Sequence, residues 1–134
     1  MQVKIKLTKE RIPSRIYIYA IRCLVNDKRY IGRTGNPTSR VEQHEYMLRS
    51  GTHHNKSLQR DYNKYGDENF VFEIIEEGDF GIWDAEKWWM YYFKTYARKH
   101  GYNGNDGAFR KKTQYELNAV RDLIMRGIEY GRKQ

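Results

Sequence analysis

The sequence IYIYAIRCLVNDKRYIGR, residues 16–33, contains the strongest indication of the fold. Apolar and polar side chains alternate through much of residues 16–22 and again in 29–33, and such alternation is typical of β-strands that bury one face. Asn26 and Asp27 lie between the two runs, and both residue types favour tight turns. The stretch therefore predicts an antiparallel hairpin.

The two faces of the first predicted strand carry different side chains. Tyr17 and Tyr19 share one face, whereas isoleucines occupy the other. A further alternating run, residues 70–76, predicts another strand of the same sheet. Residues 3–7 also alternate, and their lysines are typical of an edge strand that avoids unwanted pairing.

Three helices are expected beside this sheet, over residues 37–50, 56–65 and 84–96. The first begins at Asn36-Pro37, an N-cap residue followed by proline in the first helical position, and it ends before Gly51. The second ends before Gly66. The third contains the run WWMYYF, residues 88–93, which predicts a largely buried helix.

Together these elements predict an α/β (α+β) fold, with a small, mixed, largely antiparallel three-stranded sheet flanked by helices. Residues 1–14 would be an N-terminal edge strand or extension, 15–107 the main domain, and 108–134 a basic linker with a C-terminal amphipathic helix. That helix is expected over 114–130, where apolar residues recur at helical spacing: Leu117, Val120, Ile124 and Ile128. Such a stripe most often packs on its own domain; a homodimer contact or a docking site for a targeting partner is the alternative.

The composition narrows the class of partner. Lys and Arg number 25 against 17 Asp and Glu, so the formal net charge is +8, which suits a polyanionic partner, although a merely basic surface is the plainer interpretation. The single cysteine excludes an internal disulfide, and no Cys/His cluster has zinc spacing. No apolar stretch approaches membrane-spanning length. An intracellular protein is expected, without secretion or a membrane partner.

Residues 15–107 contain a series of short sequence motifs and single polar residues in a particular order. They are Tyr17-Ile18-Tyr19, Tyr30-Ile31-Gly32, Arg40, His44, His53, the stretch LQRDYNKYG at 58–66, Glu86 followed by Trp89, and Gly101-Tyr102-Asn103. This ordered set resembles the GIY-YIG nuclease family, and most closely the catalytic domains of phage and intron homing endonucleases. One departure is Tyr17, which stands where the family usually has glycine. A bulky ring there could alter strand contacts, partly cover the site, or itself be functional.

The resemblance implies five catalytic residues: Tyr19, Tyr30, Arg40, His44 and Glu86. One tyrosine hydroxyl would act as a base or position water and the other would support it; otherwise both rings are ordinary hairpin core. Arg40 would clamp phosphate through its guanidinium fork, rather than being an exposed helix arginine. His44 would contact phosphate or relay a proton. Glu86 would be the ligand for Mg²⁺ (or Mn²⁺).

Glu86 is also a candidate functional residue when the family resemblance is set aside. On the expected third helix it shares a face with Trp89, Met90 and Phe93. A carboxylate among such neighbours is costly to bury unless a cation or another group pairs with it. The alternative is a glutamate favoured near the helix start by the helix dipole.

Supporting roles are expected for four residues. Tyr17 shares the strand face of Tyr19, Gly32 closes the second triplet, His53 would contact phosphate or relay a proton, and Asn103 would support the metal site or the scaffold. Basic side chains that would otherwise be solvated charges are candidates for contacts with the DNA backbone: Arg33, Lys56, Arg60, Lys64, Arg110, Lys111 and Lys112.

The expected function is metal-dependent hydrolysis of phosphodiester bonds in DNA, inside the cell or, for a phage protein, in the host cytoplasm. Two alternatives come from other functional classes. One is a nucleic-acid-binding module that keeps the fold without cutting, with Tyr17 as the marker of that change. Intact Glu86 and Arg40 argue against it, because a pure binder has little use for an inward carboxylate. The other is an accessory subunit whose terminal helix docks a targeting partner.

Overall fold

The computed structural model describes residues 1–5, 14–79, 82 and 85–105. Its strands are β1 (Gln2–Lys4), β2 (Ile16–Cys23), β3 (Arg29–Thr34) and β4 (Phe70–Gly78), and its helices are α1 (Pro37–Ser50), α2 (Lys56–Tyr65) and α3 (Ala85–Tyr92). Short 3-10 turns cover Asp67–Asn69 and Asn103–Asn105. The expected C-terminal helix and the basic run 110–112 lie outside the described residues. No helix within the described part of the chain is long and apolar enough to cross a bilayer.

The sheet has four strands in the order β1-β4-β2-β3. β2 is antiparallel to both of its neighbours, and the short β1 runs parallel to β4, with Gln2 opposite Val71. The mixed, largely antiparallel sheet is confirmed. Its expected size of three strands is corrected to four, because the N-terminal edge strand joins the same sheet rather than forming a separate extension.

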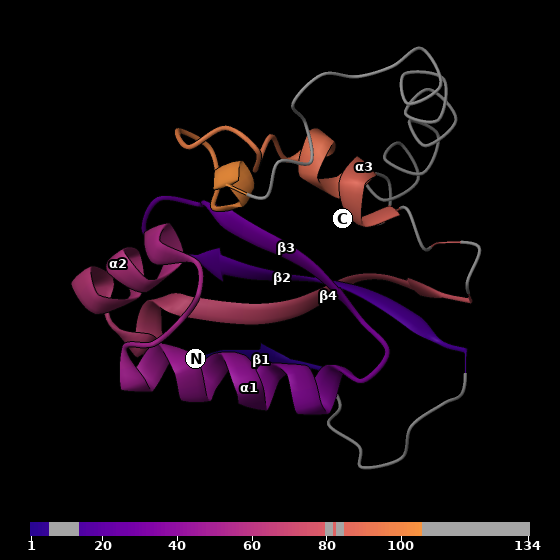
Figure 1. Ribbon diagram of the computed structural model, residues 1–134, viewed down its shortest axis with the longest axis horizontal. Helices are drawn as coiled ribbons and strands as arrows, with labels where there is room; N and C mark the ends of the chain where they lie inside the picture. The colour runs from indigo at the N-terminus through magenta and orange to yellow at the C-terminus, as the bar shows by residue number, and fades with distance from the viewer. Residues whose placement is uncertain (6–13, 80–81, 83–84, 106–134) are drawn as a thin grey trace.

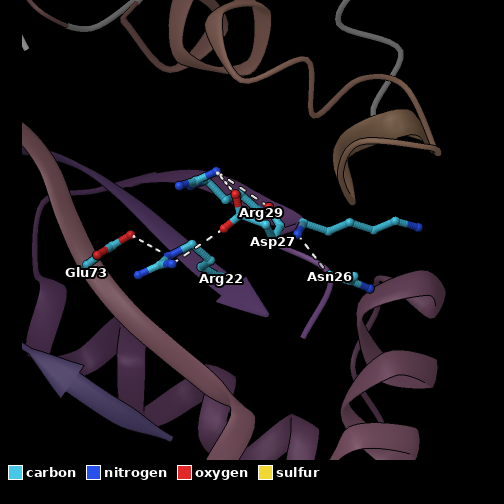
Figure 2. A network of polar contacts seen from close by, with 6 residues as sticks. Arg22, Asn26, Asp27, Arg29 and Glu73 are labelled. Carbon is cyan, nitrogen blue, oxygen red and sulfur yellow. Dashed lines mark hydrogen bonds and ion pairs between the residues drawn. The ribbon is translucent and has the colours of Figure 1, made fainter. Parts of the chain in front are cut away.

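The β2–β3 hairpin is closed by polar contacts at its tip, which Figure 2 shows. Arg22 lies between two carboxylates, with Nε 3.3 Å from Glu73 Oε1 and Nη1 3.5 Å from Asp27 Oδ1. Arg29 reaches the same Asp27 at 3.7 Å. Asp27 adopts a left-handed φ of 61°, a conformation that aspartate tolerates better than most residues. The turn expected at Asn26-Asp27 is confirmed.

Two apolar clusters lie on the two faces of the sheet. The first packs α1 and α2 against it and includes Tyr19, Ile21, Cys23, Val41, Leu48, Leu58, Tyr62, Phe70, Phe72 and Tyr102. The second packs α3 against the other face and includes Ile16, Ile18, Ala20, Ile31, Ile82, Ala85, Trp88, Trp89 and Met90. Figure 1 shows α1 and α2 along one side of the sheet, and α3 with the Asn103–Asn105 turn along the other. The fold is therefore a three-layer sandwich.

The first two helices have the predicted bounds. The Asn36 side chain accepts a hydrogen bond from the Ser39 N–H, and the chain leaves α1 at Gly51 with φ 75°. Asn55 caps α2 in the same way, accepting from the Leu58 N–H at 3.0 Å. α3 ends at Tyr92, four residues before the expected 96. There the chain turns back toward the sheet, with Lys94 at a left-handed φ of 58°.

Candidate active site

The Tyr19 hydroxyl lies at the centre of the candidate site. Its ring is 1% exposed and stacks on Phe72 with 4.8 Å between centroids. The pairing of β2 with β4 shifts by one residue between Ile18 and Tyr19. The shift places one extra residue, Ile75, on β4, whereas β2 continues without interruption and pairs regularly with β3. Because side chains alternate along β2, Tyr19 points with Ile21 into the layer between the sheet and α1.

Two buried histidines extend a series of hydrogen bonds that begins at the Tyr19 hydroxyl. The Tyr19 hydroxyl oxygen is 2.7 Å from Nε2 of His44, which lies on α1. Nδ1 of His44 is 2.8 Å from Nε2 of His53, which lies in the loop between α1 and α2. Nδ1 of His53 accepts a hydrogen bond from the backbone N–H of Asn55 at 3.0 Å. A continuous hydrogen-bonded chain therefore runs from the hairpin to the start of α2.

Burial keeps these side chains uncharged. It lowers the pKa of His44 to about 3, with smaller contributions from the nearby His53 and Arg40. It lowers the pKa of His53 to about 4, and His54 adds to this effect. Burial also raises the pKa of the Tyr19 hydroxyl well above its ordinary value. All three groups are neutral near pH 7.

Two charged side chains act on Tyr19 from opposite layers of the sandwich. Arg40, half-buried on α1, lowers the pKa of the Tyr19 hydroxyl through its charge and a hydrogen bond, although burial and Tyr30 outweigh it. Glu86, half-buried on α3, raises the same pKa. Arg40 is one helical turn before His44, so these two side chains share a face of α1. Arg40 and Glu86 thus both act electrostatically on the Tyr19 hydroxyl, with opposite sign.

Tyr30 forms a second pair with a residue that the sequence reasoning did not select. Its hydroxyl is 3.4 Å from Nε2 of His54, an exposed side chain. The His54 ring stacks on His53 with 4.4 Å between centroids. Three histidines and two tyrosines are therefore contiguous. The one available signal for His54 was its position beside His53 in the sequence GTHHN, residues 51–55.

Comparison with known proteins identifies this arrangement. A model of the GIY-YIG catalytic domain matches residues 15–103, a span that contains all of these tyrosine, histidine, arginine and glutamate side chains. The chain belongs to the GIY-YIG nuclease family.

One related protein and two solved structures agree with this family assignment. The chain is 33% identical over 97 residues to "Intron-associated endonuclease 1" of Enterobacteria phage T4, which covers 69% of this chain and 38% of that protein. It therefore spans well under half the length of this relative. The catalytic domain of intron endonuclease I-TevI, solved as a mutant, superimposes with a TM-score of 0.61 at 29% identity, covering 69% of this chain and 95% of that one. A second structure of that catalytic domain gives a TM-score of 0.59 at 27% identity, covering 64% and 96%.

Close packing of the Tyr19 ring explains why residue 32 of the GIY-YIG domain is glycine. It pairs with Tyr19 across the hairpin. A Cβ atom at position 32 would overlap the Cζ and hydroxyl oxygen of the Tyr19 ring. Glycine is required here because the Tyr19 ring passes directly over the β3 backbone. The supporting role expected for Gly32 is consistent with this contact.

Asn103 closes the outer edge of β3 in the GIY-YIG domain. Its Oδ1 accepts from the Ile31 N–H at 2.9 Å, and its Nδ2 donates to the Ile31 carbonyl at 3.1 Å. Tyr102 adds a backbone hydrogen bond to the Arg29 carbonyl at 3.0 Å. The side chain thus takes the place of a further strand beside the second triplet. Of the two expected uses of Asn103, this geometry favours the scaffold.

Of two kinds of metal site, the closed zinc type and the magnesium type, the side chains of the described residues fit the magnesium type. Among the described residues, no group of three or more His, Cys, Asp or Glu side chains is arranged to hold a metal ion. A closed zinc site needs such a group. Mg²⁺ is commonly held by one or two carboxylates, with water and substrate phosphate completing its shell. The single carboxylate of Glu86, near a phenol and an arginine, fits that second pattern.

The remaining predicted residues that the structure describes lie on β2, β3 and α2. Tyr17 is half-buried and pairs with Thr34 across the hairpin, at the end of β3 that leads into α1. The basic residues expected to contact DNA include Lys56, Arg60 and Lys64, all exposed on α2, and the half-buried Arg33 on β3. Their contacts with DNA stay a prediction.

Proposed function

We propose that this GIY-YIG domain is a metal-dependent endonuclease that hydrolyses phosphodiester bonds in DNA, in the manner of a homing endonuclease. The observation that carries the proposal is the buried Tyr19 hydroxyl, bonded to His44 at 2.7 Å and influenced electrostatically by both Arg40 and Glu86, within a matched GIY-YIG domain. A carboxylate and a guanidinium beside a phenol provide the oxygen ligand, the phosphate clamp and the proton acceptor that phosphodiester hydrolysis needs.

Each side chain then has a part in the reaction. Arg40 binds a non-bridging phosphate oxygen and stabilises the charge that grows on it in the transition state. One of the two tyrosines, Tyr30 or Tyr19, first loses its hydroxyl proton to solvent, and the resulting phenolate positions the attacking water and accepts its proton. Glu86 holds the cation, which when bound would polarise the phosphate and stabilise the leaving oxygen. Removal of the Glu86 charge by that cation would also favour ionisation of Tyr19.

The basic residues on α2 and β3 supply contacts to the DNA backbone. Such contacts give salt-dependent affinity with little sequence preference. Site selection, a homodimer or a targeting partner would therefore depend on the region after the domain, including the stripe Leu117, Val120, Ile124 and Ile128.

The test is cleavage of supercoiled plasmid by wild type, Glu86→Ala and Glu42→Ala, with Mg²⁺ or with a chelator. Glu42 is the matched control, because it is an exposed glutamate on α1. We expect nicked or linear product only with Mg²⁺, from wild type and Glu42→Ala, and a loss of at least about a hundredfold in Glu86→Ala. Full cutting by Glu86→Ala would mean that the metal site is elsewhere.

The same proteins distinguish the alternatives. A gel-shift measurement of DNA binding by the wild type, without cutting under any metal condition, would favour a binding module. Cutting that appears only when a second protein is added would favour an accessory subunit.

A further inference from the structure

The backbone N–H of Asn55 determines where the proton of His53 lies. A peptide N–H can only donate, so His53 Nδ1, at 3.0 Å from it, must be an unprotonated acceptor. A neutral imidazole carries one N–H, and that proton therefore lies on Nε2 of His53. This assignment follows from the partner of the ring and needs no observed hydrogen.

The position of the His53 proton in turn fixes the position of the proton on His44. His53 Nε2–H donates to Nδ1 of His44 across 2.8 Å. His44 is then unprotonated at Nδ1 and carries its own proton on Nε2. That N–H faces the Tyr19 hydroxyl oxygen at 2.7 Å, so His44 donates and Tyr19 accepts.

The opposite polarity is disfavoured. If Tyr19 donated to His44, His44 would donate to His53, and the proton of His53 would lie on Nδ1 against the Asn55 N–H. Two donors facing each other in a buried site lose their hydrogen bonds without water to replace them. An imidazolium at either position is disfavoured by burial and by the neighbouring Arg40 and His54 side chains.

The backbone N–H of Asn55 is held in place because the side chain of the same residue is fixed by hydrogen bonds. Its side-chain Oδ1 accepts from the Leu58 N–H at 3.0 Å as the N-cap of α2, and its Nδ2 donates to the Tyr102 carbonyl at 2.6 Å. The Gln59 side chain accepts from the His53 N–H at 3.0 Å and so anchors the same loop. The Asn55 N–H, which is the first donor of the hydrogen-bonded series, therefore belongs to the rigid framework of the domain.

We propose that the Asn55 backbone N–H, acting through His53 and His44, holds the Tyr19 hydroxyl as a hydrogen-bond acceptor and directs its proton away from His44. His53 is then a positioning residue with no direct contact to phosphate. His44 is a fixed N–H donor that stabilises negative charge on Tyr19, and it does not remove the Tyr19 proton. The catalytic meaning rests on the proposed nuclease function, whereas the tautomers do not.

The first test is long-range ¹H–¹⁵N correlation NMR of ¹⁵N-histidine-labelled wild type at neutral pH, without DNA or metal. The chain has only four histidines, and single His→Gln variants assign their signals. We expect a protonated, pyrrole-like Nε2 and an unprotonated, pyridine-like Nδ1 for both His44 and His53. A proton on Nδ1 of either ring, an imidazolium, or averaged signals would overturn the proposal. Plasmid cleavage is measured separately, so a failed nuclease proposal leaves this result standing.

The second test compares His53→Gln with His53→Leu. Glutamine can keep a donor at the position of Nε2, whereas leucine fills the space without one. We expect His44 to keep its Nε2–H signal in His53→Gln and to show mixed tautomers in His53→Leu. We expect cleavage kcat to fall about tenfold further in the leucine variant, with unchanged DNA Kd. A weaker Kd with normal His44 tautomers would show that His53 instead contacts phosphate.

Discussion

Gly32 shows how one missing side chain makes room for the catalytic centre. The Tyr19 ring lies where a Cβ of residue 32 would be, so Gly32→Ala must displace the ring or the strand. We expect Gly32→Ala to lower the free energy of unfolding by about 1–3 kcal/mol, the usual cost of overpacking. It should also abolish plasmid cleavage, because the Tyr19–His44 contact at 2.7 Å is lost. Urea unfolding and the plasmid assay measure the two effects.

Gly51→Ala is the matched control for this prediction. Gly51 has a left-handed φ of 75° with no atom near its Cβ position, so alanine there strains the backbone without touching the site. We expect a similar loss of stability, about 1–2 kcal/mol, with cleavage retained. If both variants cut equally well, the tight packing of Tyr19 on Gly32 is not needed for activity.

Residue spacing could predict which side chains meet, but not how they are connected. The order of Tyr19, Arg40, His44 and Glu86 was sufficient to propose one site, because those positions follow a known pattern. The hydrogen bond from the Asn55 amide to His53 has no sequence signature, since every residue except proline offers a backbone N–H.

At the scale of elements, the edge of β3 depends on a side chain rather than a strand. The Asn103 amide satisfies both the N–H and the carbonyl of Ile31. We expect Asn103→Ala to cost about 2–3 kcal/mol in urea unfolding, because two buried backbone groups lose their partners. Cleavage should fall with it, because β3 also carries Tyr30 and Gly32.

The same variant tests the alternative role of Asn103 at a metal site. Titration of Mg²⁺ in the cleavage assay distinguishes the two roles. A scaffold role predicts that extra Mg²⁺ does not restore activity. Recovery at high Mg²⁺ together with unchanged stability would instead place Asn103 beside the cation. Gln43→Ala, which removes an exposed side-chain amide on α1, serves as the control.

The ends of helices were predictable only where the stop signal is local. Asn36, Pro37 and Gly51 act within one turn of α1, and its bounds agree with prediction. α3 ends early because the chain must turn so that Gly101 can pack against the Thr95 backbone, where a Cβ atom has no room. That contact forms only in the folded domain, so the apolar run in residues 88–93 carried no sign of it.

At the scale of the whole molecule, two histidines of the candidate site are also part of the core. His44 and His53 are 1% and 0% exposed, so the chain buries two titratable groups to build the site. The three-layer arrangement requires this, because Tyr19 reaches α1 only through the interior. Activity and acid stability are therefore coupled in this fold.

This coupling predicts an acid-sensitive domain. In the unfolded chain both histidines have a pKa near 6.5, whereas burial lowers the pKa to about 3 for His44 and about 4 for His53. Below about pH 6.5 the unfolded chain therefore binds protons that the native state does not, so the stabilisation is complete above that pH and is lost as pH falls toward 4. Each histidine contributes at most about 1.4 kcal/mol per pH unit to the slope. Urea unfolding between pH 7.5 and pH 4 should show a flatter profile for His44→Gln/His53→Gln than for wild type, with His100→Gln, at an exposed position, as the matched control. Parallel profiles for all three proteins would mean that the two imidazoles gain protons in the native fold over the same pH range as in the unfolded chain, so that the site becomes positively charged below about pH 6.5.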